Sequence, residues 1–405
     1  MVNPTPGTSG EVPPTCPHCG AAISPESRVC PSCGALQPVK KTGFTAGSTV
    51  DLGDARIVLD AQLGEGGMGI VWRGWLFHAP GTPRASDPPL PIAFKALAPR
   101  ARAVPELRAL FLREAEAMRA LSHPNVVRFH ALADRAGELG IAMELVDGDN
   151  LEAVIARHVA RARLAGPHGL PGLPFRRAWH YMEQLLGGLG GAHALGLVHR
   201  DVKPSNVLIR RDGMVKLSDF GIAQLSSQPD PAMADPNVLP PGTGPYMSPE
   251  QVLARPLDGR SDLYSAGIVL YEMIAGRTPF DTEGRGELVM RQDHVLTPPP
   301  PVRRFVPQAP PILDALFLRA LAKDPSARFG SAIEMGDAFR SALGIPESPE
   351  WRAQAELAHV ARVSTPPDAR SSSPTGVSTP VGRAERMATL RLFLNERYRT
   401  AKMER

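Results

Sequence analysis

Cysteine is nearly absent from this chain of 405 residues: only four occur, and all of them lie between positions 16 and 33. Long apolar runs are absent as well, since none approaches the roughly 18 residues that a membrane-spanning helix needs. The start of the sequence has no apolar signal-peptide core after a basic flank. These absences argue against a membrane-spanning or exported protein, and we expect a soluble, cytoplasmic protein with no transmembrane segment.

A large excess of one charge is also missing. The formal net charge is +4, so charge alone gives no reason to expect nucleic-acid binding. The chain does have 43% hydrophobic residues, which is enough for a substantial core in one large or two medium domains. Its 43 prolines are about twice the usual share and indicate proline-rich linkers and loops.

The cysteines form two Cys-x-x-Cys pairs, Cys16 with Cys19 and Cys30 with Cys33. Four thiolates at this spacing can converge tetrahedrally on one Zn²⁺ ion, with no open position for catalysis. The pattern predicts a structural zinc ribbon at residues 15–36, which is too short to bury a core and should fold only with metal. The alternatives are a disulfide pair, a redox Cys-x-x-Cys motif, or a histidine of the first pair acting as a ligand.

The segment His199–Asn206 collects groups suited to moving a phosphoryl group. The carboxylate of Asp201 can accept a hydroxyl proton, and the ammonium of Lys203 can neutralise a phosphate in transfer. The side-chain amide of Asn206 can hold a metal ion. A short predicted hairpin, 207–209 with 215–217, then leads to Asp219, whose carboxylate is a ligand that Mg²⁺ prefers.

Glycines at positions 64, 66 and 69 lie between two β-prone runs, residues 56–63 and 70–75. Such a hairpin can lay backbone N–H groups over phosphates, but a lone G-x-G-x-x-G also occurs in dinucleotide-binding proteins. A dinucleotide loop opens a helix, whereas here a second strand follows and then the run Ile92–Lys95. Residues 105–121 have apolar side chains at helical spacing and predict a helix that ends before Pro124.

Taken in order, the glycine loop, Lys95, the segment 199–206 and Asp219–Gly221 resemble a bacterial Hanks-type serine/threonine protein kinase. The resemblance implies an α+β, bilobal protein-kinase fold, with a small antiparallel β lobe that carries a helix and a large, mainly helical lobe. The predicted domains are a zinc ribbon 15–36, a linker 37–51, a kinase domain 52–344 with lobes 52–146 and 147–344, a Ser/Thr/Pro-rich linker 345–382, and a basic amphipathic helix 383–405.

The resemblance also implies roles for individual residues and the cofactors ATP and Mg²⁺ or Mn²⁺. Glu114 would pair with Lys95, with Glu116 as its competitor on the same helix. The implied catalytic residues are Asp201, Lys203, Lys95 and Glu114, and the implied magnesium ligands are Asn206 and Asp219. The implied ATP-binding residues are Gly64, Gly66, Gly69, Val71, Ala93, Lys95, Met143, Glu144, Val146 and Leu208.

Four further residues have structural roles in the family, and one selects the substrate. Glu250, in a Ser-Pro-Glu that stands where the family usually has Ala-Pro-Glu, would pair with Arg328, while Asp262 would brace the backbone of the catalytic loop. Phe220 would pack against the helix that carries Glu114. Thr243 resembles the threonine that bonds to the catalytic loop and helps to select aliphatic hydroxyl acceptors.

The last segment has Met387, Leu390, Leu394 and Tyr398 at helical spacing, with seven basic and three acidic side chains between 383 and 405. It can dock on a protein partner, lie on a membrane surface, or pack on the kinase. Three functions compete for the whole chain: an active kinase that acts on Ser/Thr of protein substrates, a pseudokinase scaffold, and a nucleic-acid-binding ribbon with the kinase as its regulator. The ribbon lacks a basic and aromatic stripe, so we expect a protein partner for it and no nucleic acid.

Overall fold

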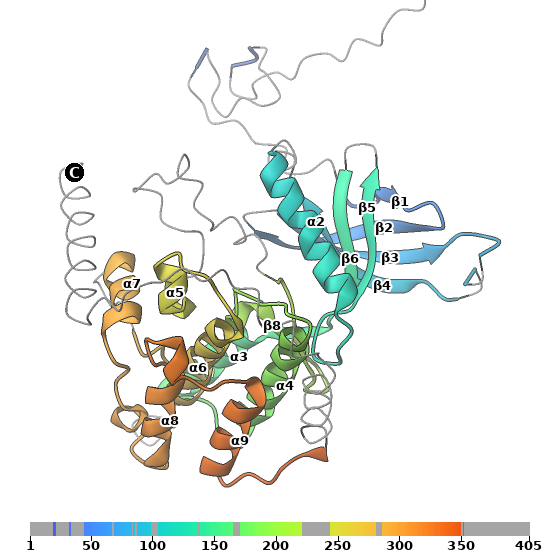
Figure 1. The fold of residues 1–405 in the computed structure, drawn as a ribbon. Coiled ribbons are helices and arrows are strands. Elements are labelled where there is room, and N and C mark those ends of the chain that lie inside the picture. Colours follow the sequence, from blue (N-terminus) through green and yellow to red (C-terminus); the bar gives the residue numbers. More distant parts are fainter. Residues whose placement is uncertain are drawn as a thin grey trace, which may run out of the picture. The chain divides into compact units, whose positions relative to one another are not determined.

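The protein is described from a computed structural model, and the two compact units in it are treated one at a time (Figure 1). The sheet unit comprises Met1–Arg108 and Ala131–Ala142, and the helical unit comprises Ala109–His130 and Met143–Arg405. The residues described are 19–21, 32–33, 44–66, 69–82, 84–85, 87–98, 104–135, 138–164, 171–220, 244–280, 286–349 and 351.

One antiparallel-paired sheet organises the first unit, with the strand order β1-β2-β3-β4-β6-β5. The β-prone runs 56–63 and 70–75 lie in β2 and β3, which pair antiparallel as a hairpin, so the predicted glycine-rich hairpin is confirmed. The strands are β1 Thr49–Asp51, β2 Ala55–Gly66, β3 Gly69–His78, β4 Leu90–Leu97, β5 Phe129–Arg135 and β6 Glu138–Glu144.

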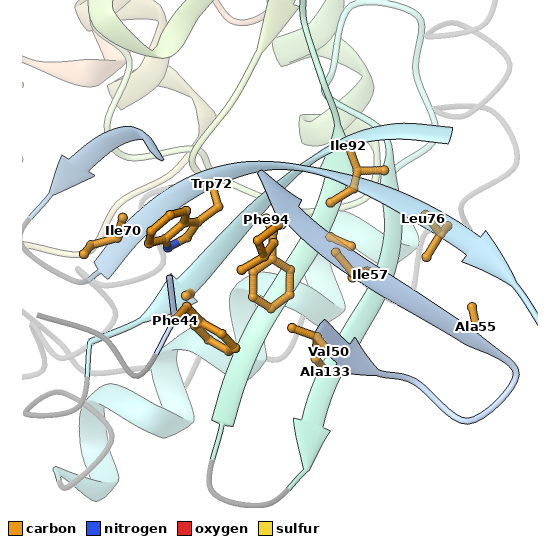
Figure 2. Close-up of a cluster of buried hydrophobic side chains, with 13 residues drawn as sticks. Phe44, Val50, Ala55, Ile57, Ile70, Trp72, Leu76, Ile92, Phe94 and Ala133 are labelled. Atoms are coloured by element: carbon orange, nitrogen blue, oxygen red, sulfur yellow. The ribbon is translucent and has the colours of Figure 1, made fainter. Parts of the chain in front are cut away.

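Aromatic and branched side chains on one face of this sheet form its core (Figure 2). Side chains alternate between buried and exposed along much of β3, as expected for a strand with one face covered. The rings of Phe44 and Phe94 meet edge to face with their centroids 5.5 Å apart, a favourable aromatic geometry. Gly140 on β6 leaves room for this packing, because a Cβ there would lie 2.2 Å from Cζ of Phe94.

The predicted helix after the sheet strands is α2, Pro105–Ala120, and it ends four residues before Pro124. Its buried face contains Leu110, Phe111, Ala115 and Met118, as the periodicity predicts, together with Glu114. Burial of a carboxylate costs free energy unless the carboxylate has a partner. The buried position of Glu114 therefore indicates a function and not a solvated surface residue.

The helical unit contains a small sheet with the strand order β7-β8-β9. Its helix α6, whose residues are almost all buried, packs against α4 and α8. The hairpin predicted around Asp212 and Gly213 is confirmed as β8 and β9; Gly213 has φ +89°, which favours glycine. The strands are β7 Gly148–Asn150, β8 Val207–Arg210 and β9 Val215–Leu217. The helices are α3 Leu151–Leu164, α4 Phe175–Ala194, α5 Pro249–Val252, α6 Gly259–Ala275, α7 Glu287–Leu296, α8 Ile312–Ala320 and α9 Ala332–Ala342, with 3-10 turns η1 Pro204–Asn206, η3 Gly244–Tyr246, η4 Val302–Arg304 and η5 Pro325–Ala327.

Packing in the helical unit continues past residue 344, where the sequence pattern suggests the kinase domain ends. Trp351 is 0% exposed, and its ring meets that of Trp179 on α4 at 71°, with centroids 6.2 Å apart. Its Nε1 donates a hydrogen bond of 2.9 Å to Oδ1 of Asp337. Gly336 on α9 makes the space, since a Cβ there would lie 2.2 Å from the Trp351 ring. Trp351, which lies within the predicted linker 345–382, is therefore packed against the helical unit.

Within the described part of the chain, no helix has both the length and the apolar character needed to cross a membrane. The predicted helix 383–405 lies outside the described residues, as does the predicted linker 345–382 after residue 351. Residues 37–43 of the predicted linker 37–51 are likewise outside them, whereas residues 44–51 are described.

Candidate active site

The segment His199–Asn206 connects α4 to β8, and a buried carboxylate holds its backbone. Asp262, in the first turn of α6, is 1% exposed. Its Oδ2 accepts hydrogen bonds from the N–H of His199 at 2.8 Å and from Nε2 of His193 at 2.7 Å, and its Oδ1 accepts one from the N–H of Arg200 at 2.8 Å. Burial alone would raise the pKa of Asp262, but these donors outweigh burial and hold the pKa below its usual value.

Asp201 has two side-chain partners within the same loop. Nζ of Lys203 lies 2.7 Å from Oδ2 of Asp201. Nδ2 of Asn206 donates to the carbonyl of Asp201 at 2.9 Å and to its Oδ2 at 3.0 Å. Both bonds from Asn206 use its nitrogen, so its Oδ1 is the atom with which this side chain can ligate a hard cation. The three side chains that the sequence singles out are therefore together.

Asp219 follows β9 with φ 54°, a left-handed conformation that is uncommon outside glycine. Its neighbour Ser218 makes three hydrogen bonds to the catalytic segment. Its carbonyl accepts a bond of 2.9 Å from Nε2 of His199, and its N–H and Oγ donate to the carbonyl of Asn206 at 2.9 and 3.1 Å. Burial lowers the pKa of His199, which keeps this ring neutral. Phe220 is buried and its ring centroid lies 4.7 Å from that of His199.

Glu250 and Arg328 form a buried, bidentate ion pair. Nη1 and Nη2 of Arg328 each donate a bond of 2.7 Å to one oxygen of Glu250. Oγ of Ser261, the residue before Asp262, donates a further bond of 2.5 Å to Oε1 of Glu250. Burial would raise the pKa of Glu250, but these bonds and the charge of Arg328 hold the pKa below its usual value. The ion pair joins α5 to the end of η5, and the bond from Ser261 joins α5 to the first turn of α6.

In the sheet unit, pairing aligns the residues predicted to hold phosphates. Gly64 on β2 lies opposite Val71 on β3, and Val71 lies opposite Lys95 on β4. Gly66 lies opposite Gly69, and a Cβ at Gly69 would lie 1.9 Å from the carbonyl oxygen of Ala96. Ala93 occupies the position two residues before Lys95 on the same strand. A strand rather than a helix follows the glycines, which argues against a dinucleotide loop.

The remaining predicted ATP-binding residues lie in the helical unit. Met143 is buried at the end of β6, Leu208 lies on β8, and Val146 follows in the connection to β7. Glu144 accepts a hydrogen bond of 2.8 Å from Nζ of Lys216 and one of 3.1 Å from the N–H of Arg128. The side chain of Glu144 is therefore used within the helical unit, and its N–H donates a bond of 2.8 Å to the carbonyl of Arg128. The resemblance assigns the backbone of Glu144 to adenine.

Glu114 is 3% exposed on α2, whereas Glu116 is exposed, so burial favours Glu114 as the partner predicted for Lys95. Lys95 belongs to the sheet unit and Glu114 to the helical unit, and their pairing remains a prediction. Of the predicted zinc ligands, Cys19 and Cys33 are exposed. Cys16, Cys30 and Thr243 lie outside the described residues.

Two contacts around the site have no counterpart in the sequence-based assignment. His193 holds Asp262, and Gln251 on α5 donates a hydrogen bond of 2.6 Å to the carbonyl of Arg200. The sequence does contain one signal for the second: Ser248 followed three residues later by Gln251 is a capping-box spacing. The structure has that capping box at the N-terminus of α5.

Residues 58–338 match the family of protein kinase domains. The chain belongs to the protein kinase family. The kinase domain of PknI from Mycobacterium tuberculosis resembles it with a TM-score of 0.55 and 30% identity over 75% of this chain and 100% of that one. The predicted α+β, two-lobed protein-kinase fold is therefore confirmed. Residues 15–36 match the zinc-ribbon domain family, the range predicted from the cysteines.

Similar kinases occur in several bacteria. The serine/threonine-protein kinase PknJ of Mycobacterium tuberculosis is 33% identical over 339 residues, which are 76% of this chain and 52% of PknJ. The serine/threonine-protein kinase Pkn1 of Myxococcus xanthus is 34% identical over 333 residues, which are 81% of this chain and 41% of Pkn1. The chain thus spans about half the length, or less, of these relatives.

Proposed function

We propose that the chain is a serine/threonine protein kinase that transfers the γ-phosphoryl group of ATP to Ser or Thr hydroxyls of proteins in cytoplasmic signalling. The observation that carries the proposal is the cluster of Asp201, Lys203 and Asn206. Nζ of Lys203 and Nδ2 of Asn206 lie 2.7 and 3.0 Å from Oδ2 of Asp201. The names of PknJ and Pkn1 support serine and threonine as acceptors.

Each residue of the cluster has a chemical task in this proposal. Asp201 accepts the proton of the attacking hydroxyl, and its carboxylate, held by Asn206, points that hydroxyl at the phosphorus. Lys203 carries the positive charge that offsets charge developing on the transferred group. Oδ1 of Asn206 and the carboxylate of Asp219 would hold Mg²⁺ or Mn²⁺, hard cations that prefer such oxygens. When bound there, the cation would neutralise part of the charge of the phosphates.

The roles in ATP binding that the resemblance implies belong to the same proposal. Gly64, Gly66 and Gly69 supply backbone N–H groups without side chains in the way, and Lys95, placed by Glu114, holds the α and β phosphates. The base would make apolar contacts with Val71, Ala93, Met143 and Leu208. It would form hydrogen bonds with the backbone of Glu144 and Val146. Thr243 would favour aliphatic hydroxyls over tyrosine.

An assay of the full chain with labelled ATP, Mg²⁺ and generic protein acceptors tests the proposal directly. Label on serine and threonine, and little on tyrosine, is the expected result. A chain that binds ATP but labels no acceptor, itself included, would favour a pseudokinase scaffold instead. Acid hydrolysis of the labelled protein identifies the modified amino acid.

The N-terminal module is proposed to be a structural zinc ribbon in which Cys16, Cys19, Cys30 and Cys33 bind one Zn²⁺ as thiolates. The donor set supports this, since four thiolates suit zinc and persist in a reducing compartment. The match to the zinc-ribbon domain family has the same range. We propose protein partners for the ribbon and for the helix 383–405, and no nucleic acid.

Metal analysis should find about one equivalent of zinc in the full chain and none in a chain that starts at Thr49. A chelator should release this zinc and unfold the ribbon, while kinase activity with excess Mg²⁺ stays unchanged, because every cysteine precedes residue 34. Zinc that stays with the shortened chain would contradict the assignment. So would kinase activity that falls in proportion to the zinc removed.

A further inference from the structure

The side-chain amide of Gln251 joins two segments that are distant in the sequence. Gln251 is 7% exposed on α5. Its Oε1 accepts a hydrogen bond of 2.9 Å from the N–H of Ser248, and its Nε2 donates a bond of 2.6 Å to the carbonyl of Arg200. One end of the amide thus holds the start of α5, and the other end holds the residue before Asp201.

The backbone of Arg200 has an unfavourable conformation that neighbouring groups hold in place. Its φ is 70°, in the left-handed region that is unfavourable for residues other than glycine. Its N–H is held by Oδ1 of Asp262 and its C=O by Nε2 of Gln251. Two independent elements, α6 and α5, therefore clamp the two peptide units that flank this strained residue.

The second of those peptide units sets the direction of Asp201. The carbonyl of Arg200 and the N–H of Asp201 belong to one planar group, and that N–H donates a bond of 3.3 Å to Nδ1 of His199. The bond from Gln251 is shorter and comes from an element outside the loop. Rotation of this plane would move the Cα–Cβ bond of Asp201 and with it the carboxylate that Lys203 and Asn206 contact.

We infer that Gln251 is a positioning residue for Asp201: its amide fixes the Arg200–Asp201 peptide plane and couples it to the ordered start of α5 at Ser248. The inference rests on the proposed kinase function. It goes beyond the bracing of this loop by Asp262, because Gln251 acts on the opposite side of Arg200 and from α5, the helix that also carries Glu250. A mere helix-capping role for Gln251 is the alternative.

Replacement of Gln251 by glutamate separates the two roles. The introduced carboxyl has the same shape, but when ionised it cannot donate to the carbonyl of Arg200, whereas when protonated it can. The ratio of kcat in Q251E to kcat in the wild type should be about 0.1 or less at pH 8, because small misplacements of a catalytic group cost up to about 10²-fold. The ratio should rise several-fold as the pH falls to about 6, because burial raises the pKa of the introduced carboxyl and the protonated form can donate. The titratable groups that line the same cavity are Arg200, Asp201 and Tyr246. They are present in both proteins, so the ratio removes the contribution to the pH dependence of kcat that the two proteins share.

Three variants serve as controls. Q251M should lose kcat by a similar factor at every pH, with KM for ATP unchanged, because methionine offers no donor. Ser248→Ala removes the Oγ that caps α5 but leaves the bond from Gln251 to Arg200, so kcat should stay within about two-fold. Gln184→Glu is a matched amide replacement on α4, where Gln184 holds Gly213 and Val215. It should also leave kcat within about two-fold.

Hydrogen exchange measured by mass spectrometry gives a readout that needs no catalysis. Exchange in 199–206 should be faster in Q251M, and in Q251E at pH 8 after correction for intrinsic rates, but unchanged in S248A and Q184E. If these variants exchange faster but the wild-type chain has no transferase activity, the proposed function is wrong, whereas the inference that Gln251 fixes the Arg200–Asp201 peptide plane holds. Unchanged exchange and kcat in Q251E, or equal losses in S248A, would overturn the inference. If Q251M does not fold, the isosteric Q251E decides.

Discussion

Asp201→Asn should lower kcat by about 10²-fold or more while ATP still binds. Asparagine has nearly the same shape as aspartate, so the hydrogen bond from Asn206 can persist, but an amide cannot accept the proton of the attacking hydroxyl. It also lacks the charge that Lys203 pairs with at 2.7 Å. The measurements are kcat at saturating ATP and Mg²⁺, and the dissociation constant for ATP by equilibrium titration.

Asp149→Asn is the matched control for this prediction. Asp149 lies in the same unit and pairs with Arg157 at 2.7 Å, but both side chains are about half exposed and neither belongs to the site. The control should leave kcat unchanged. Equal turnover in D201N and the wild type would refute the assignment of Asp201 as the base. A loss of ATP binding in D201N would indicate a folding defect and not a chemical one.

Arg328→Met should lower the free energy of unfolding by about 3–5 kcal/mol, the usual effect of removing one partner of a buried ion pair. The side chain of Arg328 is 0% exposed, and its loss leaves the buried carboxylate of Glu250 with the hydroxyl of Ser261 as its remaining side-chain donor among the contacts described. Urea unfolding of the full chain, followed in the wild type and the variant, measures the difference.

Two comparisons test the cause of that loss. Arg157→Met removes an exposed pair and should leave stability unchanged, because exposed pairs contribute little. Glu250→Gln combined with R328M should recover part of the loss, since no unpaired charge is then buried. The pKa of Glu250 is lowered in the fold, so its stabilising effect is present above its unfolded pKa and is lost as the pH falls through its folded pKa. The gap between wild type and R328M should therefore narrow in acid.

Local sequence patterns predict the elements of the site well. The hairpin of β2 and β3, the helix α2 and the hairpin of β8 and β9 follow from spacing and turn residues that act over a few positions. Asp201, Lys203 and Asn206 are within six residues of one another, so the loop that carries them brings them together. Helical spacing also puts Glu114, and not Glu116, among the buried residues of α2.

Contacts between distant segments could not be predicted in this way. The bond from Gln251 to Arg200 spans 51 positions, and the ion pair of Lys216 with Glu144 spans 72. Each depends on how helices and strands pack, which periodicity does not determine. The burial of Lys216 within β9 gives no sequence signal, because its neighbours Val215 and Leu217 set the apolar pattern of the strand.

The packing of Trp351 decides where a recombinant kinase domain should end. The family match ends at residue 338, and a chain cut there or at 344 would lose the ring that covers Trp179 and fills the notch at Gly336. The indole of Trp179 and the backbone at Gly336 would then lose their cover and form an apolar surface that favours association with a second molecule. Expression vectors that stop after residue 351 keep this surface closed, and proteolytic trimming of the full chain should leave a fragment that still contains Trp351.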